Sequence, residues 1–364
     1  KIAEEEKSFE ATELLEKGRE RFWNALGYKS MKEWKVPGAY KLATALNFPA
    51  DADPRILFND VISIFSKVIL KNPNLAAAYS FRGRAYAEIG EFKKALSDSN
   101  KAITLQPSNE EYYRNRGFIY KAKGLNQKAI HDFNKAVELK PDEAWNYFIL
   151  ADIYEKKKQN DKAIYNLSKI IDLPMNDYTV LAYSKRAELY YHIEDTNLSL
   201  KDVNRAIELE PNRSAEDYRL RGLIYYFRDE YASAIADFSI SLELSPQNWG
   251  VYLFRGDSYL MTEKYDLAIA DFDKYIKEVN SKHFDVYKKR ADAYLQLEQY
   301  FKASLDYSKA IRLRKDYAEA YVGRAASYQG MNMMKSAIAD YKKACKLGND
   351  GGCLGMKMIL EDSE

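Results

Sequence analysis

Aromatic and small residues recur at helical spacing along residues 76–109, in two separate stretches. The first stretch has an aromatic, a glycine and an aromatic at i, i+4 and i+7, and the second has three small residues at the same intervals: Tyr79, Gly83 and Tyr86, then Ala95, Ser99 and Ala102. Residues at these intervals lie on one face of a helix. The segment therefore predicts two closely packed antiparallel helices, joined by a turn at Gly90 and ended by Pro107.

The same pattern returns in eight registers up to residue 345. The repeats begin at Ala76, Glu110, Ala144, Val180, Ala215, Trp249, Phe284 and Ala318. The pattern Y-x3-G-x2-Y, followed by A-x3-[FYS]-x2-A and a proline, resembles the tetratricopeptide repeat (TPR), whose period is 34 residues. This resemblance implies an all-α fold, a right-handed TPR superhelix (an α-solenoid) made of antiparallel helix pairs.

Residues 1–75 depart from the regular pattern and predict a helical cap or degenerate TPR. We expect one helix over residues 4–26 and a second over residues 55–71. The segment between them, about 27–53, predicts an inserted loop that contains aromatic residues and prolines. We favour a loop that covers the open end of the first repeat; the alternative is a binding loop.

The eight repeats occupy residues 76–345, and residues 346–364 predict a C-terminal capping helix. The stretch ACKLGNDGGC resembles cysteine-rich secreted Sel1-like repeat proteins, in which a C-x7-C pair joins one repeat to the next helix. The resemblance implies a disulfide between Cys345 and Cys353, and hence an extracytoplasmic location: periplasm, cell surface or secreted. The alternative is two free thiols in a cytoplasmic protein. The sequence leaves open whether a signal peptide or lipid anchor precedes Lys1.

Seven repeats carry an arginine three residues after the first tyrosine and an aspartate before the aromatic position of the second helix. The third repeat has lost both and carries Leu150 and Asn166. Joint loss indicates that the two partners pair within one repeat, because a half-buried arginine without its carboxylate is strongly destabilising. The alternative is a phosphate-binding ladder. The predicted structural ion pairs are Arg82–Asp98, Arg116–Asp132, Arg186–Asp202, Arg221–Asp237, Arg255–Asp271, Arg290–Asp306 and Arg324–Asp340.

Composition narrows the classes of function. Lysine and arginine number 56 against 54 acids, a net charge of +2, which gives no indication of nucleic acid or an anionic membrane as partner. The sequence contains no apolar run of 18 residues, so we expect no transmembrane segment in this chain. Motifs of nucleotide sites, zinc peptidases and serine hydrolases are missing, and the three histidines lie far apart in sequence. We expect no enzyme, catalytic residue, metal or cofactor.

The TPR resemblance implies a concave groove lined by the first helix of each repeat, chiefly at its second, fifth, ninth, twelfth and thirteenth positions. Read onto this chain, the middle of the groove is apolar with interspersed charges, a composition typical of peptide-binding hot spots. The predicted groove residues are Arg114, Phe118, Trp145, Phe148, Asp152, Lys156, Glu188, Arg219, Leu223, Tyr226, Phe227 and Asp257.

These positions predict a noncatalytic scaffold or adaptor that holds a peptide or helical segment of another protein. Aromatic residues would anchor the ligand, while Arg114, Lys156 and Arg219 would orient it. The alternative is an extracytoplasmic protein that binds a non-protein ligand, a cell-wall glycan or a lipid, in the same groove. The sequence identifies neither the partner nor the oligomeric state.

Overall fold

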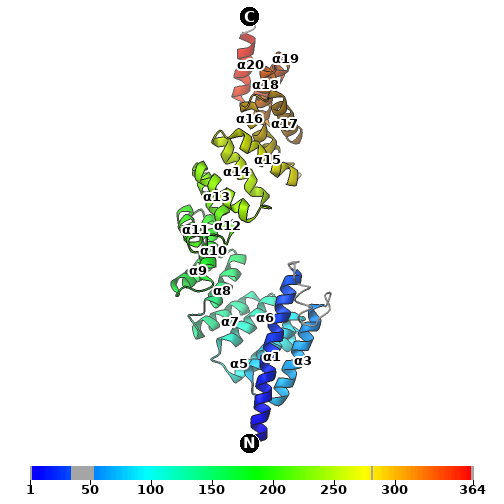
Figure 1. Ribbon diagram of the computed structural model, residues 1–364, viewed down its shortest axis with the longest axis vertical. Helices are drawn as coiled ribbons and strands as arrows, with labels where there is room; N and C mark the ends of the chain where they lie inside the picture. The colour runs from blue at the N-terminus through cyan, green and yellow to red at the C-terminus, as the bar shows by residue number, and fades with distance from the viewer. Residues whose placement is uncertain (1, 34–52, 280–281, 362–364) are drawn as a thin grey trace. The chain divides into compact units, whose positions relative to one another are not determined.

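The computed structural model describes residues 2–33, 53–279 and 282–361, and every regular element within these ranges is an α-helix (Figure 1). The all-α class predicted from the sequence is confirmed. The chain divides into two compact units, Lys1–Ala182 and Tyr183–Glu364.

The first unit is built from pairs of consecutive helices. Its helices are α1 (Ile2–Glu33), α3 (Pro54–Lys71), α4 (Ala76–Glu88), α5 (Phe92–Leu105), α6 (Glu110–Ala122), α7 (Asn126–Leu139), α8 (Ala144–Lys156) and α9 (Asn160–Asp172). Within it α4 packs against α5, α6 against α7 and α8 against α9. We call the first helix of each pair helix A and the second helix B.

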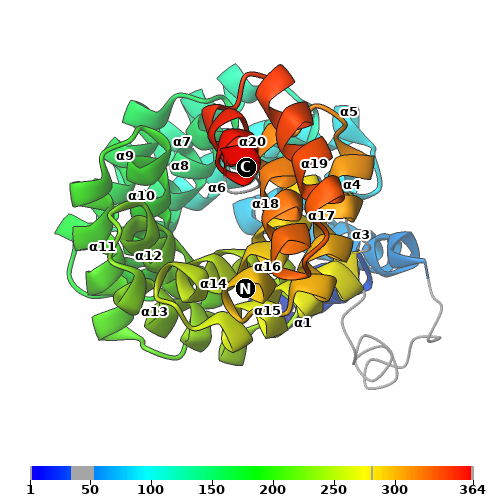
Figure 2. The same cartoon turned by 90° about the horizontal axis from the view of Figure 1, so that it is seen from above.

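The second unit continues the same scheme, and α10 (Thr179–His192) runs across the boundary between the units. Its other helices are α11 (Thr196–Leu209), α12 (Ala215–Phe227), α13 (Tyr231–Leu244), α14 (Trp249–Met261), α15 (Tyr265–Val279), α16 (Phe284–Gln296), α17 (Tyr300–Leu313), α18 (Ala318–Gly330), α19 (Met334–Lys346) and α20 (Asp350–Glu361). Figure 2 shows the A helices α14, α16 and α18 on the inner side of this unit and the B helices α15, α17 and α19 on its outer side.

Close approach within a pair depends on small residues of helix A that face a ring of helix B. A Cβ added at Gly117 would lie 2.9 Å from the ring of Phe133, and one at Gly222 would lie 2.7 Å from the ring of Phe238. Both rings are fully buried. Glycine at these positions lets the two helices meet with the ring between them.

The N-terminal helices α1 and α3 form a pair of the same kind. A Cβ added at Gly18 would lie 2.8 Å from the ring of Phe65, the relation that Gly117 has to Phe133. Phe22 and Phe58 join the buried core of this pair. Helix α1 continues to Glu33, beyond the expected end at residue 26, so residues 27–33 are helical rather than part of a loop. Gly27 has nothing within 4 Å of its added Cβ, so it costs the helix only its intrinsic propensity. The rest of the expected insert, residues 34–52, lies outside the described residues.

The turn from helix A to helix B places one residue in the left-handed region in every repeat. Gly90 has a φ of 85° and Gly124 a φ of 77°, and non-glycine residues such as Lys158 take the same place with a φ of 57°. The amide of Glu91 then donates to the carbonyl of Tyr86 at 2.8 Å, which satisfies the end of the helix.

Candidate functional site

A ladder of arginine–aspartate pairs runs along the repeats. In seven repeats the arginine of helix A donates its Nε and Nη2 to the two carboxylate oxygens of the aspartate on its own helix B, at 2.6–2.9 Å. The pairs are Arg82–Asp98, Arg116–Asp132, Arg186–Asp202, Arg221–Asp237, Arg255–Asp271, Arg290–Asp306 and Arg324–Asp340. These bidentate contacts join the two helices of one repeat, as the sequence predicted.

Each ladder arginine makes further contacts that sequence reasoning did not identify. The guanidinium carbon of Arg116 lies 5.7 Å from the ring centre of Tyr113 and 5.9 Å from that of Tyr120. Its Nη1 donates to Oδ1 of Asn100 in the preceding repeat at 2.8 Å. The hydrogen bond to Asp132 raises the pKa of Arg116 despite its burial. The arginine thus also links neighbouring repeats.

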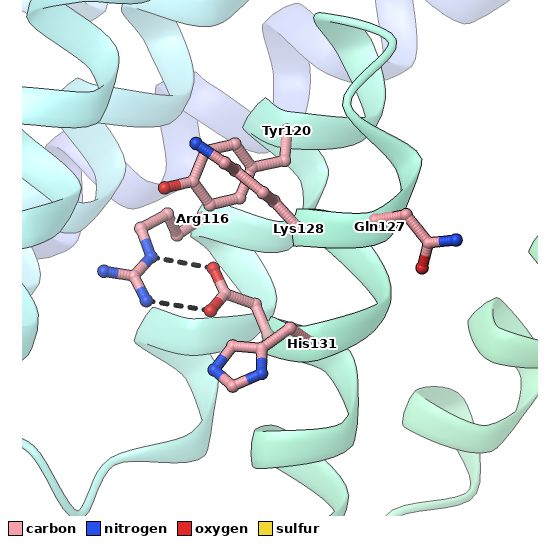
Figure 3. Close-up of a pocket in the computed structure, with 6 residues that line it drawn as sticks. Arg116, Tyr120, Gln127, Lys128 and His131 are labelled. Carbon is pink, nitrogen blue, oxygen red and sulfur yellow. Dashed lines mark hydrogen bonds and ion pairs between the residues drawn. The ribbon is translucent and has the colours of Figure 1, made fainter.

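A pocket of about 310 Å³ lies over one rung of this ladder (Figure 3). It is lined by Arg116, Tyr120, Gln127, Lys128, His131 and Asp132. Arg116 and Asp132 satisfy each other, and the ammonium of Lys128 lies 5.7 Å from the ring centre of Tyr120. The pocket contains none of the predicted groove residues, and its charged pair is already engaged.

A first group of partly exposed rings lies on the helix-A side of the first unit; we call Trp145, Phe148 and Tyr178 the Trp145 cluster. The rings of Trp145 and Phe148 are stacked, with centroids 5.8 Å apart and planes 13° apart. Tyr178 closes the group at 5.3 Å from Trp145 and 5.7 Å from Phe148. Tyr178 was missed in the sequence because it lies between helices. Only the lengthened end of the third repeat marks the unusual connection there.

Charged groups flank this cluster. Asp152 accepts hydrogen bonds from Lys121 at 2.8 Å and from Lys156 at 3.1 Å. Burial opposes its ionisation, but the two lysines lower the pKa of Asp152 overall. Lys156 remains 68% exposed at its side chain, and Lys121 is only 32% exposed. Lys156 is therefore presented to solvent while it is held on one side by Asp152.

A second group of rings lies in the second unit; we call Tyr226, Phe227 and Phe254 the Tyr226 cluster. Tyr226 lies 5.2 Å from Phe227 and 5.4 Å from Phe254, both edge to face. Phe227 is 65% exposed. Phe254 was not predicted, because the sixth position of helix A was not among those assigned to the groove.

The remaining predicted groove residues take different places. Phe118 packs edge to face on Phe133 at 5.3 Å, and Glu188 lies 3.4 Å from Lys185. Arg219 pairs with Glu216. Leu223 is only 7% exposed and packs in the core of its helix pair, so it supports the face from beneath.

Asp257 is also buried, at 7% exposure. It accepts from the hydroxyl of Tyr226 and from Lys289, each at 2.6 Å. Asp257 therefore holds neighbouring side chains of the face in place.

Cys345 and Cys353 lie at disulfide distance, with sulfur atoms 1.95 Å apart, as the resemblance implied. They join α19 to α20, whose Ile359 packs with Ala325 and Tyr341. In the part of the chain that the structure describes, no helix is long and apolar enough to cross a membrane. The same residues contain no group of three or more histidine, cysteine or acidic side chains placed to hold a metal ion.

Repeated antiparallel helix pairs with a core within each pair define an α-solenoid repeat protein. Family models match the chain as TPR repeat over residues 83–124 and as tetratricopeptide repeat over residues 110–143, 219–282 and 318–348. The chain is a tetratricopeptide repeat protein, with the all-α fold of paired helices that its sequence predicts.

Three curated human relatives match parts of the chain. Tetratricopeptide repeat protein 13 is 32% identical over 96 residues, 26% of this chain and 11% of that protein. Mitochondrial import receptor subunit TOM70 is 30% identical over 103 residues, 28% of this chain and 17% of the relative. Serine/threonine-protein phosphatase 5 is 29% identical over 135 residues, 37% of this chain and 20% of the relative. The chain thus spans at most a fifth of each relative's length.

The chain is also similar to parts of solved structures. A crystal structure of MamA is 20% identical, with a TM-score of 0.44, and the match covers 47% of this chain and 93% of that one. A tetratricopeptide repeat protein from Parabacteroides merdae is 22% identical, with a TM-score of 0.43, and the match covers 69% and 98%.

Proposed function

We propose that this chain is a noncatalytic scaffold or adaptor that binds a peptide or helical segment of another protein in the concave groove of its A helices. The Trp145 cluster carries the proposal. Its three rings contact one another and remain partly exposed. Aromatic side chains that are held in place but still accessible are the usual anchors of protein interfaces.

The support beneath the cluster favours binding over simple packing. Trp145 rests against a buried core that includes Ile149, Leu150 and Ile153. The cluster is therefore ordered before a ligand arrives, which reduces the entropy lost on binding. The outward faces of the rings stay available for an apolar side chain.

The second unit offers a comparable but separate contact surface. The Tyr226 cluster presents Phe227, and Arg219 remains 33% exposed at its side chain. Arg219 would orient a ligand at this surface by its charge, as Arg114 and Lys156 would at the surface of the first unit. We expect each unit to contribute contacts of its own.

We also propose an extracytoplasmic location for this chain. A disulfide between Cys345 and Cys353 favours an oxidising, extracytoplasmic compartment. The proposed function assigns no catalytic, metal-binding or cofactor role to any residue and involves no nucleic acid. TPR units typically act by binding other proteins.

The decisive experiment is affinity capture from an extract of the source cells, followed by titration of the purified partner. We would compare wild type with Trp145→Ala/Phe148→Ala and with Tyr165→Ala as matched control. Tyr165 is 60% exposed but lies on a B helix, α9. We expect the double variant to bind at least about tenfold more weakly, and the control to bind like wild type.

Equal binding by all three proteins would show that the partner does not use the Trp145 cluster. Retention of a glycan or lipid in place of a protein, with the same dependence on Trp145 and Phe148, would support the alternative ligand class. Circular dichroism and melting temperatures establish that the double variant is folded before the affinities are compared.

A further inference from the structure

Two arginines on the helix-A face of the first unit differ from the ladder arginines. Neither Arg84 nor Arg114 has a carboxylate within 4.0 Å among the residues that the structure describes. The one hydrogen bond of Arg84 runs from Nη1 to Oδ1 of Asn115, at 3.4 Å. Arg114 makes neither a hydrogen bond nor an ion pair within the described chain. Both guanidinium groups therefore keep donors for a ligand.

Aromatic rings hold Arg84 in position. Its guanidinium carbon lies 4.8 Å from the ring centre of Phe118 and 5.0 Å from that of Phe22. Asn115 is itself fixed, because its Nδ2 donates to the hydroxyl of Ser80 at 2.9 Å. The rings exclude water from the faces of the guanidinium and favour its charge, yet they leave its N–H edge without an anion.

The pKa of Arg84 is shifted in the opposite direction from that of the ladder arginine Arg116. Burial lowers the pKa of Arg84 to about 10; Glu88 opposes this effect, and the charge of Arg114 adds to it. For Arg116 of the ladder, the hydrogen bond to Asp132 raises the pKa instead. Arg84 is thus a desolvated cation beside a second cation, and a bound anion would relieve that repulsion.

Most acids near these arginines are already engaged. Glu88 pairs with Lys29 at 2.8 Å, and Asp152 pairs with Lys121 and Lys156, each at 2.8 Å. Glu111 is the remaining acid whose charge reaches Arg84. The local balance stays positive, which suits an acidic ligand.

Arg114 connects this cationic place to the Trp145 cluster. Arg114 lies one helical turn before Phe118 on α6. The ring of Phe118 contacts the guanidinium of Arg84 and packs on the same buried core as Trp145. A ligand that reaches Arg114 therefore also comes within range of the Trp145 cluster. A bound segment could place a carboxylate and an apolar side chain side by side.

We infer that Arg84 and Arg114 bind an acidic side chain of a peptide whose neighbouring aromatic side chain lies on the Trp145 cluster. The planar edge of a guanidinium matches a carboxylate with two parallel hydrogen bonds. This inference rests on the proposed function and specifies its ligand: an acidic peptide with an adjacent aromatic residue.

The test selects binders from a displayed library of random 16-residue peptides on the full chain. We expect aspartate or glutamate to be enriched beside aromatic residues. The best peptide is then made with a blocked C-terminus, in an acidic form and in a form with amides in place of the acids. Both forms are titrated by fluorescence anisotropy against wild type, Arg114→Gln and Arg55→Gln. Arg55 is an exposed arginine of α3 and serves as the matched control.

Arg114→Gln should weaken the acidic peptide about tenfold and leave the amide form unchanged, whereas Arg55→Gln should change neither. Arg84→Gln should act in the same direction, and its melting temperature is measured because its side chain is packed. The inference alone would be overturned if the selected peptides contained no acids. It would also be overturned if replacing the acids by amides reduced the affinity for wild type and for Arg114→Gln by the same factor. A failure to select any peptide that depends on Trp145 would instead contradict the proposed function.

Discussion

Tyr226 on α12 donates its hydroxyl to Oδ2 of Asp257 on α14 at 2.6 Å, and Lys289 on α16 donates to the same oxygen at 2.6 Å. The three residues belong to three successive repeats. One buried carboxylate therefore ties three A helices together, and it positions the phenol ring of the Tyr226 cluster.

This contact predicts a pH-dependent contribution to stability. Burial, followed by the hydrogen bond to Asp257, raises the pKa of Tyr226 above its ordinary value of 10.0. A raised tyrosine pKa means that folding favours the protonated phenol, so the contribution is complete below pH 10 and declines as the pH rises toward the folded-state pKa. We expect Tyr226→Phe to lower the free energy of unfolding by about 1 kcal/mol at pH 8. Urea denaturation at pH 8 and above pH 10 should show the difference shrinking; a constant difference would contradict the assignment.

The ladder predicts strong coupling between the partners of one rung. Arg221→Leu alone leaves buried Asp237 without its cation and should destabilise by about 3 kcal/mol. Arg221→Leu/Asp237→Asn should recover much of that loss. It reproduces the third repeat, where Leu150 is buried and Asn166 donates to the carbonyl of Lys162 at 2.8 Å. Denaturant melts of the double-mutant cycle measure the coupling, and additive losses would remove the pairing.

The close approach of α12 and α13 predicts that the effects of substitutions at Gly222 and Phe238 on stability are coupled. Gly222→Ala should destabilise by about 1–3 kcal/mol, because the new methyl would lie 2.7 Å from the phenyl ring. Combining it with Phe238→Leu should cost less than the sum of the two single changes, since Ala151 and Leu167 already occupy these places in the third repeat. Thermal melts of all four proteins check this expectation.

The disulfide predicts a local effect at the C-terminal end. Cys345→Ser should lower the stability of the α19–α20 junction by about 2–3 kcal/mol if loop entropy dominates. Hydrogen exchange should rise in α20 before it rises in α14. Adding reductant should reproduce the effect in wild type and change nothing further in Cys345→Ser/Cys353→Ser.

The regular parts of the fold could be predicted because the residues that determine each helix and turn lie within one repeat. Tyr79, Gly83 and Tyr86 indicate a helix, and Gly90 indicates the turn. The pairing within a rung was visible because Leu150 and Asn166 are lost together. When one sequence contains many copies of a unit, the loss of two residues from the same copy indicates that their positions are in contact.

The parts that sequence reasoning missed depend on neighbours outside the repeat. The bond from Arg116 to Asn100 spans two repeats, and Tyr178 joins the Trp145 cluster from a connecting segment. The extension of α1 to Glu33 is accompanied by an ion pair between Lys29 and Glu88 of another helix. Periodicity alone does not specify such contacts, because they arise from how one unit stacks on the next.

The third repeat lacks the arginine–aspartate pair, and this affects the cooperativity of folding. Arg82 reaches Ser66 and Arg116 reaches Asn100, each in the helix pair before its own, but Leu150 can make no such bond. In a linear array, the folding of one repeat stabilises the next only through their shared interface. The interface between the second and third repeats therefore lacks the contact that the ladder arginine supplies at the interface before it. We expect partially folded states of the first unit to end at this interface.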